Sequence, residues 1–260
     1  MSIKLRSAAA RVNTRPGGLH GGGPLVWFQT QQLLNATSVT WQDNYQGFTS
    51  PQDIQQGTAI TPGFEAPMDL GQILVVTDSS GSGDVEAGGP EGGLSGENEA
   101  TSTFAVGHAK QPAEGAPGLV VAFPLESGQS LEIEPVETVL LAFVEGGLTT
   151  GVVVLTAPAS GYLVDVSGAS SGTRQVSFDI DQGWSCDGCS WAPQVTAGTQ
   201  LSSLLIQQAG AFGSPRSTRD LSLDGPGERC QRLVASQTTA LGDRVVYSRP
   251  TPSASATRSM

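Results

Sequence analysis

Two of the three cysteines lie close enough in the sequence to act together. Cys186 and Cys189 form a CxxC motif, which could hold a metal ion, form a local disulfide or carry thiol redox chemistry. A zinc site needs further ligands, and the remaining candidates are distant in sequence: Cys230, His20 and His108. We predict a turn in which both cysteines act as small apolar residues, with a disulfide and a metal site as the alternatives. The odd cysteine count and the absence of a clear secretory signal favour a reducing compartment.

Two tryptophans flank this motif and could contact a ligand. Trp184 and Trp191 fall in a loop-like stretch, where exposed aromatic rings can stack on sugars or anchor a protein partner. The alternative is a loop that folds back over the end of the domain. The candidate ligand or partner loop therefore comprises Trp184, Cys186, Cys189 and Trp191.

The remaining chemistry-bearing residues do not assemble into a catalytic motif. Asp179, Asp181 and Asp187 could bind calcium, but no EF-hand or repeat accompanies them, so solvated loop carboxylates are the preferred interpretation. The sequence contains no GxSxG elbow to accompany His20 or His108, and its glycine clusters match no phosphate-binding loop. We therefore predict no catalytic, cofactor-binding or metal-binding residues, no cofactor, and a protein that is not an enzyme.

The chain begins with a basic segment. Residues 1–16 carry Lys4, Arg6, Arg11 and Arg15 and no acidic residue, and the glycine-rich stretch RPGGLHGGG follows. Glycine loses much entropy on ordering, so the sequence predicts a flexible arm over residues 1–23. The arm could bind nucleic acid, dock on the acidic surface of a neighbouring copy, or be a disordered tail.

The rest of the chain is acidic overall. The net charge is −11, and residues 43–187 contain 20 acidic residues against Lys110 and Arg174. Such a body would repel phosphates, which argues against nucleic-acid binding outside the arm. No apolar run approaches the roughly 20 residues of a membrane helix, so no membrane contact is expected.

The central stretch from Gly118 to Ile180 predicts β-strands joined by tight turns. Val-, Leu-, Ile- and Phe-rich runs alternate there with Gly, Ser, Pro and Thr, and turn signals recur at the spacing typical of a sandwich or barrel. The expected strands cover 24–30, 37–42, 72–77, 101–106, 119–123, 130–133, 138–144, 151–156, 162–166 and 174–180. Weaker closing strands are expected at 231–235 and 244–248, and a strand or a short helix at 199–208. Residues 43–71 and the acidic, Gly/Ser-rich segment 78–100 predict loops.

The expected fold is all-β. It consists of a single antiparallel β-sandwich over residues 24–248, jelly-roll-like, with long loops and extended terminal arms at 1–23 and 249–260. Basic ends, an acidic β-domain and no catalytic motif are combined in multi-copy shell proteins. We expect a virion or phage capsid or decorating subunit, made in the host cytoplasm, whose partners are its own copies, another shell protein, or genome nucleic acid through the arm. The alternative is a carbohydrate-binding or adhesive β-domain using the Trp184–Trp191 loop.

Overall fold

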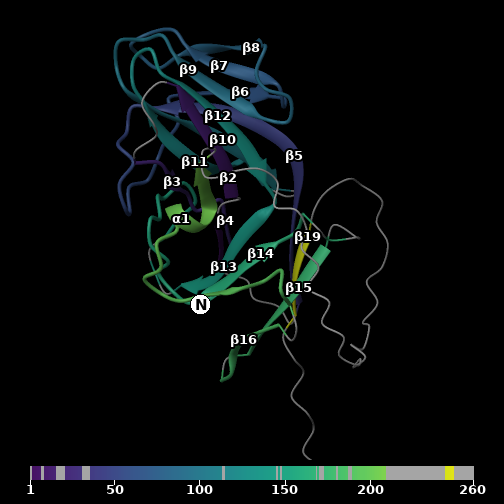
Figure 1. Cartoon of the computed structure of the whole chain (residues 1–260). Coiled ribbons are helices and arrows are strands. Elements are labelled where there is room, and N and C mark those ends of the chain that lie inside the picture. The colour runs from purple at the N-terminus through teal and green to yellow at the C-terminus, as the bar shows by residue number, and fades with distance from the viewer. Residues whose placement is uncertain are drawn as a thin grey trace, which may run out of the picture.

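The computed structural model describes most of the chain up to Gln208 and one later strand. The described residues are 2–6, 9–15, 21–30, 36–112, 115–144, 146, 148–167, 169, 173–179, 181–186, 189–208 and 244–248. The predictions for residues 231–235 and for the tail at 249–260 lie outside these ranges. The described residues form an all-β structure with several sheets, which confirms the predicted fold class (Figure 1).

Three sheets account for the strands of the described residues. The first has five strands in the order β17 (Gln194–Val195), β14 (Gly161–Asp165), β13 (Thr138–Val144), β1 (Ser2–Arg6) and β4 (Phe28–Thr30). The second has the order β16 (Gly183–Ser185), β15 (Thr173–Asp179), β19 (Arg244–Ser248), β5 (Ala36–Ser50), β10 (Phe104–Pro112), β11 (Gly118–Leu125) and β3 (Gly23–Pro24), and β6 (Phe64–Met68) also pairs with β5. The third has the order β18 (Ile206–Gln208), β2 (Ala9–Arg15), β12 (Ser130–Val136), β9 (Leu94–Asn98), β7 (Gln72–Val76) and β8 (Gly83–Ala87).

The sequence predicts an antiparallel sandwich, but three pairs of neighbouring strands among the described residues are parallel. The pairs β7–β9, β15–β19 and β2–β18 are parallel. A short helix, α1 (Ser202–Leu205), precedes β18, so residues 199–208 contain both of the predicted alternatives. The stretch 151–156 is buried as a two-sided strand would be, but it contributes only isolated bridges, such as Val153 with Leu25.

The strand β5 connects two parts of the molecule. Its first residues pair with β19, and its last residues pair with β10 on one side and β6 on the other. In Figure 1 it runs from the region of β6–β9 down to β15 and β19. The predicted loop at 43–71 is therefore wrong at both its beginning and its end. The polar pair Asp43–Asn44 interrupts the apolar pattern by which a strand is recognised, although the backbone pairing continues to Ser50.

The segment 78–100 is also not a loop throughout, because β8 and β9 lie within it. The strand β9 sits inside the third sheet between β12 and β7, and Leu94 is 2% exposed. Packing explains the glycine at position 96, because a Cβ there would come within 2.9 Å of Val106 Cγ1. Gly96, which contributes to the loop-like composition of this segment, therefore allows the third sheet to approach β10 closely.

The predicted flexible arm contains two paired strands. β1 lies between β13 and β4, and β2 lies between β12 and β18. Each strand therefore completes a sheet, which differs from the expectation of a free extended arm. Residues 7–8 and 16–20 lie outside the described ranges.

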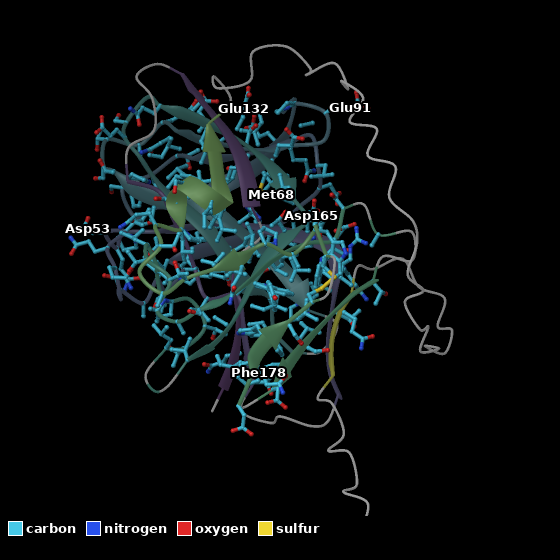
Figure 2. The ribbon with its side chains drawn as sticks, turned by 60° about the horizontal axis from the view of Figure 1, so that its bottom comes forward. Asp53, Met68, Glu91, Glu132, Asp165 and Phe178 are labelled. Atoms are coloured by element: carbon cyan, nitrogen blue, oxygen red, sulfur yellow. A yellow bond between two sulfur atoms is a disulfide. The ribbon has the colours of Figure 1, made fainter. Side chains whose placement is uncertain are left out.

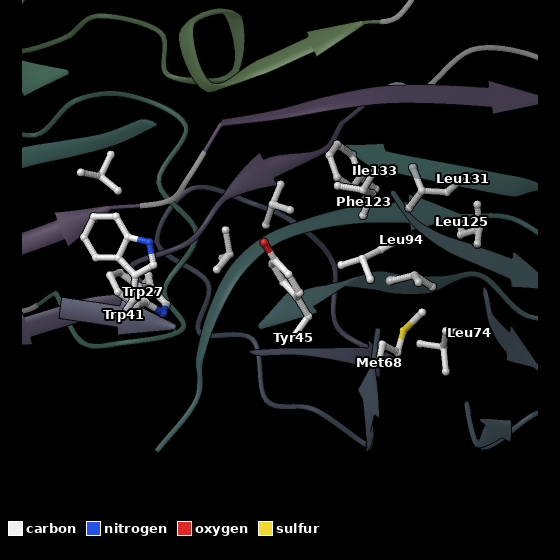
Figure 3. Packing of buried hydrophobic residues seen from close by; sticks show 14 of the residues in the cluster. Trp27, Trp41, Tyr45, Met68, Leu74, Leu94, Phe123, Leu125, Leu131 and Ile133 are labelled. Carbon is white, nitrogen blue, oxygen red and sulfur yellow. The ribbon is translucent and has the colours of Figure 1, made fainter. Parts of the chain in front are cut away.

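The largest hydrophobic cluster joins the sheets. Trp27, Trp41 and Phe123 lie in it together with aliphatic residues of the third sheet, including Leu94 and Leu131 (Figure 3). The two indole rings meet edge to face, with centroids 5.7 Å apart. Such a pair adds to the free energy of burying two large side chains.

A substitution at Asn98 tests whether β9 is a buried strand inside the third sheet. Its side chain is 0% exposed, donates hydrogen bonds to the carbonyl oxygens of Ser102 and Leu125, and accepts one from the Ala100 N–H. Asn98→Ala removes these three hydrogen bonds, two of them buried, so we expect it to lower the free energy of unfolding by about 2–4 kcal/mol. Denaturant unfolding measures this, with exposed Glu97→Ala as the control. Equal, small effects of the two substitutions would contradict the buried placement of β9.

Candidate functional site

The most distinctive polar arrangement surrounds the side chain of Lys110 on β10. This side chain is 4% exposed, and its Nζ lies 2.9 Å from Asp43 Oδ1 and 2.5 Å from Glu137 Oε1. The Asp43 side chain is 68% exposed and that of Glu137 is 20% exposed. One buried cation is thus paired with one partly buried and one solvent-facing carboxylate.

Strand geometry explains how these groups meet. Trp41, Asp43 and Tyr45 are every second residue along β5, and the side chains of all three lie around Lys110 Nζ. Lys110 lies directly opposite Tyr45 in the antiparallel register between β10 and β5. Glu137 is the single residue between β12 and β13, so it enters the site from the junction of two other sheets.

Aromatic rings enclose the ammonium group. Lys110 Nζ lies 5.8 Å from the ring centroid of Trp41 and 5.3 Å from that of Tyr45, within the range of cation–π attraction. The indole nitrogens also act as donors: Trp41 Nε1 donates to Glu137 Oε2 at 2.9 Å, and Trp27 Nε1 donates to the Lys110 carbonyl at 2.8 Å. Figure 3 shows Trp27 and Trp41 together, with Tyr45 beside them.

The charges within the site shift each other's protonation. Burial lowers the pKa of Lys110, but Glu137, Tyr45 and Asp43 outweigh burial and raise that pKa overall. Burial raises the pKa of Tyr45 to about 12, although the positive charge of Lys110 opposes this rise. At neutral pH the site therefore holds an ammonium group and a neutral phenol.

His108 lies two residues before Lys110 on β10 and is fully buried. Its ring packs edge to face against Tyr45, at a centroid distance of 5.9 Å, and neither ring nitrogen has a hydrogen-bond partner. Burial, followed by the nearby charge of Lys110, lowers its pKa to about 3. This imidazole is neutral and enclosed at physiological pH, so it is not placed to exchange protons with a substrate.

An open hollow of about 410 Å³ lies beside Tyr45. The polar residues that line it are Asn44, Tyr45, Gln46, Asp69, Gln72 and Gln111, of which four carry side-chain amides. Pro67, Met68 and Pro117 supply apolar surface. Amides that both donate and accept hydrogen bonds suit a neutral polar ligand better than an ion.

The predicted ligand loop differs from its expected form. Cys186 and Cys189 are joined by a disulfide, so the preferred interpretation of two unlinked apolar cysteines is wrong and the local disulfide is the alternative that the structure contains. Their Cα atoms are 5.6 Å apart, within the usual range for a disulfide.

The two flanking tryptophans are engaged within the chain. Trp184 stacks on Phe143 at 4.8 Å between ring centroids and meets Phe178 and Tyr162 edge to face. The guanidinium of Arg174 lies 4.8 Å from the ring centroid of Trp191. Both tryptophans are half-buried, so they pack against the domain and are not free aromatic platforms.

The four basic residues of the predicted arm fall on two strands in different sheets. Lys4 and Arg6 lie on β1 opposite Ala142 and Leu140, while Arg11 and Arg15 lie on β2 opposite Glu134 and Ser130. The backbone of these residues is thus paired within two different sheets.

Sequence reasoning missed the Lys110 site because its members are far apart and each looks ordinary alone. One signal was present: Lys110 lies at the end of the apolar strand FAVGHAK, in a chain with only one other lysine, Lys4. Among the described residues, no group of three or more His, Cys, Asp or Glu residues could hold a metal ion. No helix in the described part of the chain is long and apolar enough to span a membrane.

Comparison with protein-family models, curated proteins and solved structures found no match.

His108 generates a prediction about pH. Its pKa is near 6.5 in an unfolded chain and about 3 when folded, so the unfolded state binds more protons between these values. The stabilisation from keeping His108 neutral is fully present above pH 6.5 and is lost as the pH falls toward 3. We expect His108→Leu to flatten the loss of unfolding free energy between pH 7 and pH 4, measured by denaturant unfolding. Parallel pH profiles for the two proteins would show that His108 does not contribute.

Proposed function

We propose that the protein is a structural subunit of a multi-copy shell, either a virion or phage capsid subunit or a subunit that decorates one. The pairing of the chain ends carries this proposal. β1 and β2 are inner strands of two different sheets, and β19 lies between β15 and β5 in the third. A terminal strand that completes a sheet within its own chain can complete the same sheet of a neighbour, which is how exchanged segments join copies.

The distribution of charge favours other copies of the chain, or another shell protein, as partners. Arg11 on β2 lies in register with Glu134 on β12, so a basic terminal strand faces an acidic one. The body of the molecule is acidic, and Figure 2 shows Asp53 and Glu91 at its periphery. These features favour other copies or another shell protein over genome nucleic acid as the partner of the terminal strands. We also propose that the sheets form a jelly-roll-like sandwich in the shell wall and that the protein is located in the virion.

Two charge-reversal variants test exchange between copies. We expect the purified chain to form large assemblies, and Arg11→Glu and Glu134→Arg each to weaken them by placing like charges opposite one another. Mixing the two variants restores opposite charges only between different chains, so the mixture should assemble where each variant alone does not. Light scattering and negative-stain microscopy measure this. A wild-type chain that remains solitary at high concentration, together with a mixture that behaves like its components, would refute the proposal.

The hollow beside Tyr45 supports a second candidate function, the binding of a neutral carbohydrate. Four of its lining residues carry side-chain amides, a group that can both donate to and accept from sugar hydroxyls, whereas Trp184 is packed on Phe143. This moves the sugar-binding alternative from the Trp184–Trp191 loop to the hollow.

A glycan array distinguishes the two places. We expect Asn44→Ala to weaken binding of a captured glycan by about tenfold, since a lost hydrogen bond costs about 1 kcal/mol or slightly more. The control Trp184→Ala should leave binding unchanged. Loss of binding only in Trp184→Ala would return the site to the loop, and a wild-type chain that captures no glycan would remove this candidate.

A further inference from the structure

The Lys110 site brings a primary amine against a carboxyl group that is already held in place. Lys110 Nζ and Glu137 Oε1 are in hydrogen-bond contact, and Trp41 Nε1 fixes the other oxygen, Oε2. We propose that Lys110 and Glu137 condense to an amide, which gives the folded chain an internal isopeptide cross-link. The proposal rests on this geometry and does not depend on the function proposed above.

Each group around the pair has a role in the reaction. One proton passes from Nζ to Glu137 Oε1 along their hydrogen bond, which leaves a neutral amine and a carboxylic acid. Nζ then attacks Glu137 Cδ, and negative charge develops on Oε2, where the Trp41 N–H donates a hydrogen bond. Asp43, 2.9 Å from Nζ, takes the second proton and delivers it to the departing oxygen.

The step balances without any other reactant. A nitrogen–carbon bond forms, a carbon–oxygen bond breaks, and Oε1 leaves as one molecule of water with both protons. Nothing is oxidised or reduced. Condensation is unfavourable between separate molecules in water, but fixed neighbouring groups can reach effective concentrations of about 10⁵–10⁸ M.

The presence of lysine, and not arginine, at position 110 favours amide formation over a simple ion pair. The chain contains eleven arginines and two lysines, and a lysine occupies this enclosed position between two carboxylates. Arginine is the usual residue for a buried ion pair, because its planar group binds a carboxylate through two hydrogen bonds and never loses its charge. Only lysine can become a neutral amine and attack a carboxyl carbon.

The cross-link would tie parts of the structure that are separate in sequence. Lys110 belongs to β10 in the second sheet, and Glu137 joins β12 of the third sheet to β13 of the first. One amide bond would therefore connect all three sheets at the edge of the main hydrophobic cluster.

Intact-mass spectrometry of the denatured, reduced full-length chain tests the proposal. We expect the mass to be lower than the sequence mass by one water, and fragment spectra of a protease digest to place the amide between Lys110 and Glu137. Lys110→Arg keeps the positive charge and cannot form this amide, so it should show its full mass. The matched control Lys4→Arg should still lack one water, and Asp43→Asn should reduce the cross-linked fraction.

Fragment spectra are needed because the Asp–Gly pairs at 187–188 and 224–225 can also lose water. A wild-type chain of full mass would overturn the proposal, and so would a water deficit that persists in Lys110→Arg. A cross-link from Lys110 to Asp43 would overturn the roles assigned to the two carboxylates. The digest of the wild-type chain decides the question even if Lys110→Arg does not fold.

Discussion

The requirement to compensate one enclosed positive charge organises the centre of this molecule. The Lys110 ammonium is almost completely removed from water, and an unpaired charge there would cost several kcal/mol of solvation. Two carboxylates and two aromatic rings meet that requirement together. Trp41, Asp43 and Tyr45 all face Lys110 from the stretch of β5 in which the register with β10 shifts, from Lys110 opposite Tyr45 to Pro112 opposite Trp41.

The same requirement links the sheets. Glu137 has to reach Lys110 from the one-residue connection between β12 and β13, and Trp41 holds its second oxygen. These contacts hold the connection between the third and first sheets against β5 and β10 of the second sheet. Hydrophobic packing alone is non-directional. The directed contacts at Glu137 select one arrangement of the sheets among those that would bury similar apolar surface.

Sequence patterns predicted the strands whose composition is apolar and missed those whose composition is not. The runs at Gln72–Val76 and Thr138–Val144 were identifiable because β-branched and apolar residues follow one another there. The strands β8 and β9 were hidden by glycine and acidic residues. The pairing of β1 with β13 and of β2 with β12 joins residues more than a hundred positions apart. For the same reason Asp43, Lys110 and Glu137 could not be grouped: only the strand register brings them together.

The described ionisable groups of the interior are enclosed or paired with one another. His108 is neutral and enclosed, the Tyr45 pKa is raised by burial, and Lys110 is occupied by its two carboxylates. A protein whose internal charges hold its own sheets together meets other molecules through its outer surface. That surface includes β8, the edge strand of the third sheet among the described residues, and the chain has an excess of acidic side chains. In the proposed function, this surface and the terminal strands make the contacts between chains.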